Sequence, residues 1–349
     1  MADAAGQRGE TGEGAGWPAA PGPELEAIRE AAGRIRPYVR RTPVLAWHAP
    51  EEEGPGGRRL LKLEQLQRTG SFKVRGAFNA LLSAPASRLR RGVATASGGN
   101  HGLAVAWAAR RLGVPALVVI TEGAPASTEA KLRAYGAEVV RRGATWDDGW
   151  AWVREAAGDR LLVHPFDDPA VQAGQGTLGL EMLEAWPWEE PPTLYVAVGG
   201  GGLISGVARA VKALRPDAEV VGVEPEGAAS MSHALRLGRP EALPAVRTIA
   251  GTLAPRAVSA STLAAVARFV DRMVTVSDAE LLEAMRLLWQ EANLLVEPAG
   301  AAAQAGLERE LREGRGPAAG GAFLLLCGAN LDVDPLFAGL EASLPPPPA

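Results

Sequence analysis

A lysine in a short motif is the first residue of this chain that could do chemistry. Lys73 lies within Thr69-Gly70-Ser71-Phe72-Lys73-Val74-Arg75-Gly76-Ala77. The apolar residues 60–64 before the motif predict a strand, and residues 78–82 after it predict a helix. Gly70 is expected to end the strand and Ser71 to be the N-cap, so Lys73 is predicted in the first helical turn.

The predicted position of Lys73 bears on its protonation. The N-terminus of a helix carries partial positive charge, which disfavours an ammonium group there and favours the neutral amine. A neutral amine can attack a carbonyl carbon and form a Schiff base. Lys73 is therefore a candidate nucleophile, and the alternative interpretation is an ordinary solvated lysine at the start of a helix.

Composition excludes several classes of protein. The chain has 349 residues, 47% of them hydrophobic, which is enough for one large domain or two intertwined ones. Its net charge of -4 gives no basic excess for nucleic acid. The single cysteine, Cys327, rules out an internal disulfide and fits a reducing compartment. No apolar run approaches the length of a membrane span, so we expect a cytoplasmic protein without membrane or nucleic-acid partners.

Strands and helices are predicted to alternate along the chain. The principal predicted strands are residues 92–96, 116–120, 138–140, 161–163, 194–198, 219–224, 273–276 and 322–327. The principal predicted helices are residues 24–40, 103–112, 127–135, 172–185, 203–214, 278–292 and 298–311. This alternation indicates open α/β sheets. Residues 1–22 are expected to form a disordered tail, and the proline-rich residues 345–349 cannot extend any element.

Three turns at predicted strand ends carry polar or glycine-rich sequence, where open α/β sheets bind their ligands. The first turn is Ser97-Gly98-Gly99-Asn100-His101-Gly102. Its glycines allow close backbone approach, and the amides at the following helix start could hold a carboxylate. An ordinary glycine-rich strand-to-helix turn is the alternative.

The second turn is Gly199-Gly200-Gly201-Gly202-Leu203. Four consecutive glycines are expected to have little use in packing, and a phosphate cradle at a helix N-terminus explains them better. The turn is no Walker A loop, because Val207 follows Gly206, and it lacks the G-x-G-x-x-G dinucleotide pattern. Glu224 nevertheless ends the next strand at about the distance of a ribose-binding acid, so a nicotinamide-dependent oxidoreductase is an alternative.

The third turn is Leu326-Cys327-Gly328-Ala329-Asn330, at the end of the last predicted strand. Cys327 could be a small core residue. Beside a heterocyclic nitrogen, its thiol would instead be a weak neutral partner that leaves a pyridine largely unprotonated.

These motifs, in this order and at these distances, resemble the pyridoxal-phosphate (PLP) enzymes of fold type II, the tryptophan-synthase-β fold. Within that fold they are most similar to the catabolic threonine/serine dehydratases. Supporting stretches are residues 173–177, 222–225, 248–251 and 296–301. The resemblance implies two open, doubly wound α/β domains with PLP in the cleft between them. It places residues 23–90 and 167–344 in a large PLP-binding domain and residues 91–166 in a small one.

The resemblance also assigns roles. Lys73 would bind PLP covalently and Phe72 would pack beside its ring. Asn100 would hydrogen-bond the phenolic oxygen and Cys327 would face the pyridine nitrogen. The phosphate would lie on Gly199, Gly200, Gly201, Gly202 and Leu203. The substrate carboxylate would lie on Ser97, Gly98, Gly99, Asn100 and His101.

The reaction that the resemblance implies is β-elimination from a small hydroxy amino acid, L-threonine or L-serine. The amine of Lys73, released from the cofactor, would remove the α-proton, and the β-hydroxyl would leave. Hydrolysis of the product gives a 2-oxo acid and ammonia, so the chain is expected to be a PLP-dependent ammonia-lyase. A homodimer or homotetramer is expected.

Three features depart from the family's pattern. Gly98 stands where the racemases of this family carry a proton-donating serine, which disfavours a serine or aspartate racemase. The family's cation site would use Glu224 and the carbonyl of Ala228, but Ser230 replaces its second acid, so a divalent or monovalent cation is in question. Only a short segment follows Asn330, so feedback through a regulatory domain is not expected. A 3-hydroxyaspartate dehydratase and a non-catalytic cofactor-binding protein stay open as alternatives.

Overall fold

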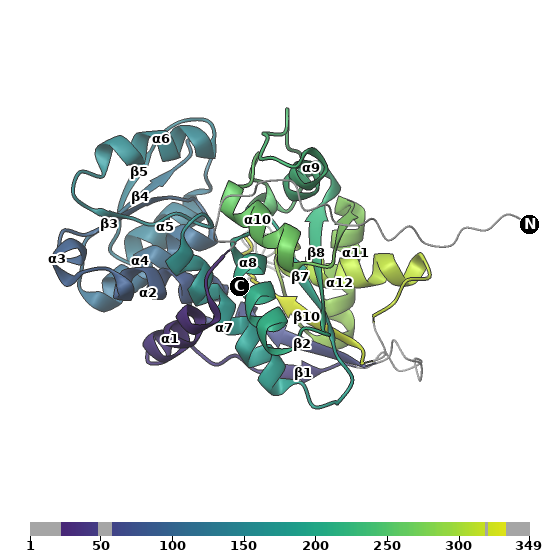
Figure 1. Ribbon diagram of the computed structural model, residues 1–349. Helices are drawn as coiled ribbons and strands as arrows, with labels where there is room; N and C mark the ends of the chain where they lie inside the picture. Colours follow the sequence, from purple (N-terminus) through teal and green to yellow (C-terminus); the bar gives the residue numbers. More distant parts are fainter. Residues whose placement is uncertain (1–21, 48–57, 318–319, 333–349) are drawn as a thin grey trace, which may run out of the picture.

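Two open sheets form the framework of the protein (Figure 1). The computed structural model describes residues 22–47, 58–317 and 320–332. Within these residues, the six-stranded sheet has the order β1-β2-β10-β7-β8-β9 and the four-stranded sheet the order β5-β4-β3-β6. The larger sheet comprises β1 (Val44–Ala46), β2 (Arg59–Leu63), β7 (Thr193–Ala197), β8 (Glu219–Pro225), β9 (Arg272–Val276) and β10 (Ala322–Leu326). The smaller comprises β3 (Val93–Ala96), β4 (Ala116–Ile120), β5 (Glu138–Arg141) and β6 (Leu161–Leu162).

Helices connect these strands. In the first part of the chain they are α1 (Leu25–Ile35), α2 (Lys73–Ser83), α3 (Ala86–Leu89), α4 (Asn100–Leu112), α5 (Ala126–Ala134) and α6 (Trp146–Ala156). In the second part they are α7 (Pro169–Ala185), α8 (Gly202–Leu214), α9 (Ser230–Leu237), α10 (Ala260–Phe269), α11 (Asp278–Ala292) and α12 (Pro298–Arg312). Strand neighbours pair in parallel except β1 and β2, which are antiparallel. The predicted α/β class is confirmed.

The smaller sheet is covered on both faces, which explains its continuous apolar strands. Along β4, Val118 and Ile120 pack in a cluster with residues of α2 and α4, whereas Leu117 and Val119 pack in a second cluster with Val153 of α6. Successive side chains of a strand point to opposite faces, so a fully buried strand needs apolar residues at every position. In Figure 1 this lobe lies at the left, separate from the six-stranded lobe.

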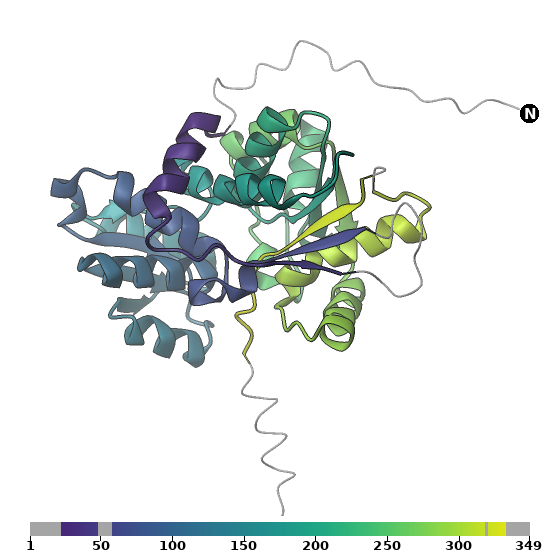
Figure 2. The ribbon, with the colours of Figure 1, turned by 90° about the horizontal axis from the view of Figure 1, so that it is seen from below.

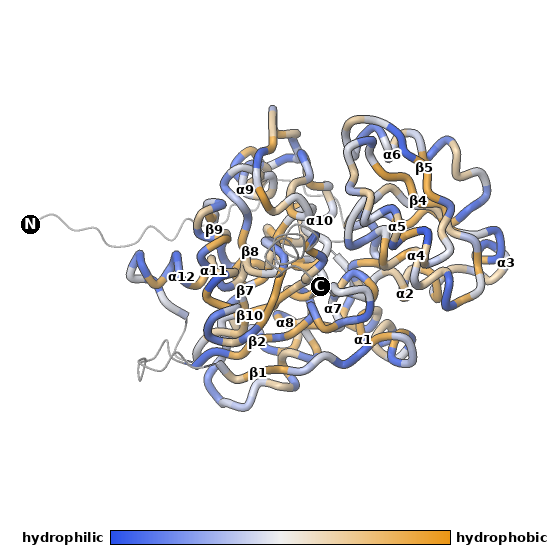
Figure 3. Tube along the Cα trace, turned by 180° about the vertical axis from the view of Figure 1, so that it is seen from behind, coloured by the Kyte–Doolittle hydropathy of each residue, from blue (hydrophilic) through white to orange (hydrophobic). Residues whose placement is uncertain are grey.

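The larger sheet is assembled from segments that are far apart in the chain. β10 is its fully buried central strand, with β2 on one side and β7 on the other. Figure 2 shows β10 beside β2 although they come from opposite ends of the sequence. In Figure 3 the strands β7 and β10 are hydrophobic and lie inside hydrophilic outer segments. The carboxyl end of β10 therefore lies at the middle of this sheet.

Several boundaries differ from the predicted ones. The strand before the lysine motif ends at Leu63, and two short 3-10 turns follow, so Gly70 does not end it. Ser71 is not the N-cap: Phe72 precedes α2 without a side-chain cap, and Ser71 is extended and pairs with Gly328. Lys73 is nevertheless the first residue of α2, which confirms its predicted place in the first turn.

Other differences have local causes. α1 ends at Ile35, shortly before Pro37, whose ring is incompatible with a continuing helix. Helices α9 and α10 were not predicted. The predicted tails lie outside the described residues, except for Gly22. No helix among the described residues has both the length and the apolar composition of a membrane span.

Candidate active site

The lysine motif is fastened to the carboxyl end of β10. The backbone N–H of Phe72 donates to the carbonyl of Cys327 at 3.1 Å, and the N–H of Ala329 donates to the carbonyl of Gly70 at 2.9 Å. Ser71 and Gly328 form an antiparallel bridge between the two segments. Because β10 is central in its sheet, this pairing places the start of α2, and with it Lys73, above the middle of the sheet.

One cavity gathers residues from all three predicted loops. The predicted residues that line it are Phe72, Lys73, Asn100, Gly199, Gly200, Gly201, Gly202, Leu203 and Cys327. Residues without a predicted role complete the lining: Phe166, Ala197, Thr252, Leu253, Glu297 and Ala299. The cavity is narrow, about 40 Å³.

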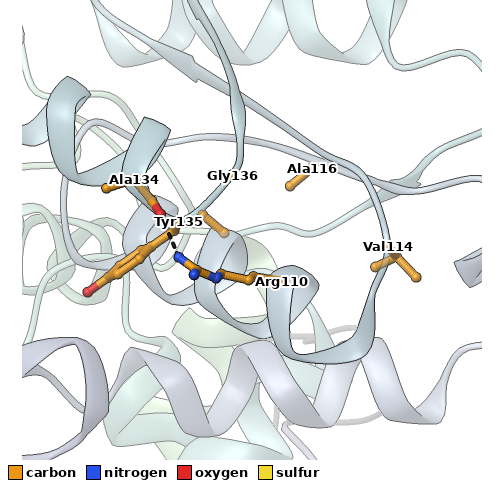
Figure 4. Close-up of a pocket in the computed structure, with 7 residues that line it drawn as sticks. Arg110, Val114, Ala116, Ala134, Tyr135 and Gly136 are labelled. Atoms are coloured by element: carbon orange, nitrogen blue, oxygen red, sulfur yellow. Dashed lines mark hydrogen bonds between the residues drawn. The ribbon is translucent and has the colours of Figure 1, made fainter.

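A larger hollow lies elsewhere and carries none of these residues. It measures about 350 Å³ and is lined by α4, α5 and the start of β4, in the smaller lobe (Figure 4). Its one charged residue, Arg110, donates to the carbonyl of Ala134 at 2.6 Å. This hollow holds no pair of acidic and basic groups, so the chemistry points to the smaller cavity.

Burial sets the protonation of Lys73. Its Nζ donates to the carbonyl of Pro165 at 2.9 Å and lies 5.2 Å from the centre of the Phe72 ring. Burial lowers the pKa of Lys73 to about 8, although the nearby Cys327 and Glu297 oppose the shift. At pH 7 about a tenth of such amines are neutral, far more than for a solvated lysine. A lowered pKa is what a nucleophilic lysine requires, and its main cause is burial instead of the helix N-terminus.

We expect Lys73 in cofactor-free protein to react with cyanate at a rate that levels off just above pH 8. The neutral amine is the reactive form, so the rate rises through a pKa of about 8 and then stays constant. Mass spectrometry of peptides after brief reaction measures it, with N-acetyl-lysine, whose pKa is about 10.4, as the reference. A Lys73 rate that still climbs steeply above pH 10 would contradict the lowered pKa.

The glycines of the second loop are required by packing, contrary to the prediction that they have little use there. A Cβ on Gly200 would lie 2.3 Å from the Phe166 ring, and one on Gly202 would lie 2.7 Å from Phe166 Cα. Gly201 has a φ of +89°, and a Cβ there would lie 2.6 Å from Met231. The loop still ends at the N-terminus of α8, where the first amides have no partner within the helix and can bind an anion.

The Ser97–His101 loop is divided between two environments. Helix α4 begins at Asn100, whose side chain lines the cavity. His101 is buried, its Nε2 lies 3.2 Å from the carbonyl of Val163, and burial holds the pKa of its ring well below the ordinary value. Ser97 Oγ accepts from the N–H of Gly99 at 3.3 Å. Ser97, Gly98, Gly99 and His101 do not line the cavity.

Cys327 presents a neutral thiol to the cavity. Its Sγ donates to the carbonyl of Ala299 at 3.3 Å, and the residue is 2% exposed. Burial, together with the charge of Glu297, raises the pKa of the Cys327 thiol well above its usual value. The side chain is therefore both a core residue and a cavity residue.

Glu297 is the main cavity residue that had no role predicted from the sequence. It is 3% exposed, and burial raises its pKa. Its Oε1 accepts from Asn100 Nδ2 at 2.7 Å and from Thr252 Oγ1 at 3.2 Å. Glu297 and Thr252 lie within or beside stretches that supported the family resemblance, and no other feature of the sequence indicated them.

Glu224, the carboxylate of the predicted cation site, is hydrogen-bonded by helix α9. Both oxygens of Glu224 accept hydrogen bonds from the start of α9: Met231 N at 2.7 Å, Ser232 N at 2.9 Å and Ser232 Oγ at 2.6 Å. Burial raises the pKa of Glu224 to about 7. Ala228 lies in the 3-10 turn between them. Within the described ranges, no group of three or more His, Cys, Asp or Glu side chains could hold a metal ion.

The chemistry of the cavity fits PLP. It offers an amine for the aldehyde, helix-start amides for the phosphate and a neutral thiol for a ring nitrogen. The hydroxyl of Ser71, beside this wall, is buried and has no hydrogen-bond partner among the described residues. An aromatic ring, Phe72, flanks the amine. These residue types suit a phosphorylated aldehyde.

Comparisons with known proteins agree with this chemistry. L-threonine ammonia-lyase from Thermotoga maritima is 40% identical over 314 residues, covering 89% of this chain and 76% of the relative. A solved structure of a threonine deaminase from T.th. is 42% identical, with a TM-score of 0.80, covering 89% of this chain and 99% of that one. Maize serine racemase is 33% identical, with a TM-score of 0.84 and coverage of 92% and 98%.

The family match spans nearly the whole framework. Residues 35–328 match the family described as "Pyridoxal-phosphate dependent enzyme". This range includes both sheets and every residue that lines the cavity. Of the turn that follows β10, Ala329 and Asn330 lie outside it. The nicotinamide alternative is therefore wrong, and Glu224 is occupied by α9 instead. The chain belongs to the pyridoxal-phosphate dependent enzymes.

Proposed function

We propose that this enzyme catalyses the β-elimination of L-threonine, L-serine or both, giving a 2-oxo acid and ammonia. The observation that carries the proposal is an amine with a pKa of about 8 facing the same cavity as a neutral thiol and a glycine loop at a helix start. The relatives named as threonine ammonia-lyase and threonine deaminase support it.

We assign the cofactor contacts as follows. Lys73 would hold PLP covalently with Phe72 beside the ring, Asn100 would donate to its phenolic oxygen and Cys327 would face its pyridine nitrogen, since all four residues line the cavity. The amides of Gly199, Gly200, Gly201, Gly202 and Leu203 hold the phosphate. When bound, PLP supplies an electron sink for negative charge at the α-carbon of the substrate. The neutral thiol of Cys327 would leave the ring nitrogen unprotonated, which would moderate that sink.

The substrate carboxylate is assigned to Ser97, Gly98, Gly99, Asn100 and His101. His101 would contribute its backbone N–H at the start of α4, because its ring faces Val163. The amine of Lys73 removes the α-proton, a task suited to a group whose pKa lies near neutrality. Elimination is favoured over racemisation because Gly98 has no side chain that could protonate the second face of the α-carbon.

Two broader assignments are also proposed. Residues 23–90 and 167–344 form the large domain and residues 91–166 the small one, a division supported by the two separate sheets, since β3, β4, β5 and β6 form one and the remaining strands the other. Helix α2 lies in the large domain by this division but packs in the hydrophobic cluster of the smaller sheet. Residues 48–57, 318–319 and 333–344 lie outside the described residues. We also propose a cytoplasmic homodimer or homotetramer. The single buried cysteine supports that compartment. Leu282 and Trp289, exposed by 49% and 55% on α11, support an oligomer, which light scattering tests.

A panel of amino acids tests the proposed reaction. We expect a yellow protein that releases 2-oxo acid from L-threonine and L-serine at least about tenfold faster than it forms D-serine. 3-Hydroxyaspartate should react more slowly, because its second carboxylate would enter a cavity that already holds the carboxylate of Glu297. Comparable rates of pyruvate and D-serine formation would favour a racemase, and colour without turnover would favour a non-catalytic binder.

A further inference from the structure

The amide of Asn330 and the carboxylate of Glu297 fix the orientation of the Asn100 side chain at the cavity wall. Asn100 Nδ2 donates to Glu297 Oε1 at 2.7 Å, while Asn100 Oδ1 accepts from Asn330 Nδ2 at 2.5 Å. A carboxylate only accepts, and an amide nitrogen only donates. If the Asn100 amide were flipped, its oxygen would face Glu297 Oε1 and its nitrogen would face Asn330 Nδ2, and neither pair can form a hydrogen bond.

The orientation of Asn330 is in turn set by the backbone. Its second amide hydrogen goes to the carbonyl of Thr69 at 2.7 Å, and a carbonyl oxygen cannot change into a donor. Thr69 has a left-handed backbone, with φ of 65°. A Cβ on the neighbouring Gly70 would lie 2.7 Å from Asn330 Oδ1, so the loop encloses this amide tightly. The carbonyl oxygen of Thr69, in the lysine motif, thus determines which atoms donate and which accept along this chain of hydrogen bonds.

Glu297 completes the arrangement from the other side. Its Oε2 accepts from the backbone N–H of Asn330 at 3.1 Å, in addition to the two donors on Oε1. Burial raises the pKa of Glu297, while the three donors and the nearby charge of Lys73 oppose that shift. One carboxylate therefore holds both Asn100 and the segment that carries Asn330.

We propose that Glu297 and Asn330 are positioning residues that hold the Asn100 amide with its second N–H toward the cofactor's phenolic oxygen. The inference rests on the proposed function, since it takes Asn100 as the donor to that oxygen. An amide nitrogen has two hydrogens, and Glu297 takes one of them. Glu297 and Asn330 thus act on the cofactor through Asn100.

Cofactor binding to stripped protein tests this arrangement. Glutamine has nearly the same shape as glutamate, but one of its two terminal atoms is an amide nitrogen, which donates and does not accept. After Glu297→Gln, either Asn100 Nδ2 or the N–H of Asn330 therefore loses its acceptor. We expect titration with pyridoxal phosphate, followed by absorbance, to show binding weakened about tenfold. Glu226→Gln, the same change on an exposed carboxylate, is the matched control and should leave binding unchanged.

A double-mutant cycle separates positioning from a general structural role. If Glu297 acts through Asn100, then Glu297→Gln should weaken cofactor binding no further once Asn100→Ala is present. Asn330→Ala, which leaves no new charge unpaired, should show the same lack of additivity with Asn100→Ala and decides the matter if Glu297→Gln does not fold. Full additivity in both cycles, or unchanged binding in both single variants, would overturn the inference. Failure of the unaltered protein to bind pyridoxal phosphate would instead overturn the proposed function.

Discussion

Lys73→Ala should reduce release of 2-oxo acid by at least about 10³-fold, because one amine both holds the cofactor and moves the α-proton. The variant should also lose the yellow colour of a covalently bound aldehyde. Its stability should hardly change, since the Nζ of Lys73 donates to the carbonyl of Pro165 while burial disfavours its charge. Steady-state assays and thermal unfolding measure the two effects.

Lys131→Ala is the matched control for this experiment. Lys131 is exposed on α5 in the smaller lobe and does not line the cavity. Its replacement should leave activity and colour unchanged. If Lys73→Ala kept more than a tenth of the original activity, the catalytic assignment of Lys73 would be wrong.

The largest effect on stability is expected from Arg75→Met. Arg75 is completely buried two residues after Lys73. Its guanidinium binds Glu64 through Nε and Nη2 at 2.9 and 2.8 Å, and Glu181 through Nη1 and Nη2 at 2.6 and 3.0 Å. Lys62 is the second cation of this network and binds Glu181 at 2.6 Å.

Methionine would fill most of the space of Arg75 but leave Glu64 and Glu181 without their main partner. Removing one member of a buried charge network typically costs about 3–5 kcal/mol in the free energy of unfolding, which urea unfolding of the apoprotein measures. Arg133→Met is the matched control: Arg133 pairs with Glu129 but is 55% exposed, so its loss should cost less than about 1 kcal/mol. A smaller loss for Arg75→Met than for Arg133→Met would contradict this account.

The Arg75 network also connects the site to the framework. Arg75 lies on α2, Glu181 on α7, and Glu64 directly after β2. Lys73 is the first residue of α2 and therefore lies on the same helix as Arg75. The buried charges therefore hold the start of α2, which carries Lys73, against both the large sheet and the long helix α7. The lysine motif contains Arg75, but nothing in the motif indicates its distant partners.

Local signals in the sequence predicted much of the fold. β4 and α11 have the predicted bounds, because an unbroken apolar run defines the strand and a Ser277–Glu280 capping box defines the start of the helix. Lys73, Cys327 and the glycine loop meet because they follow β2, β10 and β7, neighbouring parallel strands whose carboxyl ends share one edge of the larger sheet. The strand pattern therefore explains the convergence of these three, whereas Asn100 follows β3 of the smaller sheet and reaches the cavity from there.

What the sequence could not predict depends on contacts between distant segments. Ser71 has the composition of an N-cap, but pairing with Gly328 keeps it extended. Gly200 is required because Phe166, in the segment between β6 and α7, leaves no room for a Cβ there. Glu297 directly precedes α12 and enters the site because α12 packs beside β10. None of these contacts leaves a periodic pattern in the chain.

Borohydride reduction of the PLP-loaded protein tests the central claim most directly. The chain has only four lysines, Lys62, Lys73, Lys131 and Lys212. Lys62 and Lys212 are held in ion pairs with Glu181 and Asp271, and Lys131 is exposed. Reduction, digestion and mass spectrometry should find the phosphopyridoxyl group on Lys73 at close to one per chain. Its presence on another lysine, or on none, would contradict the assignment of this cavity as the active site.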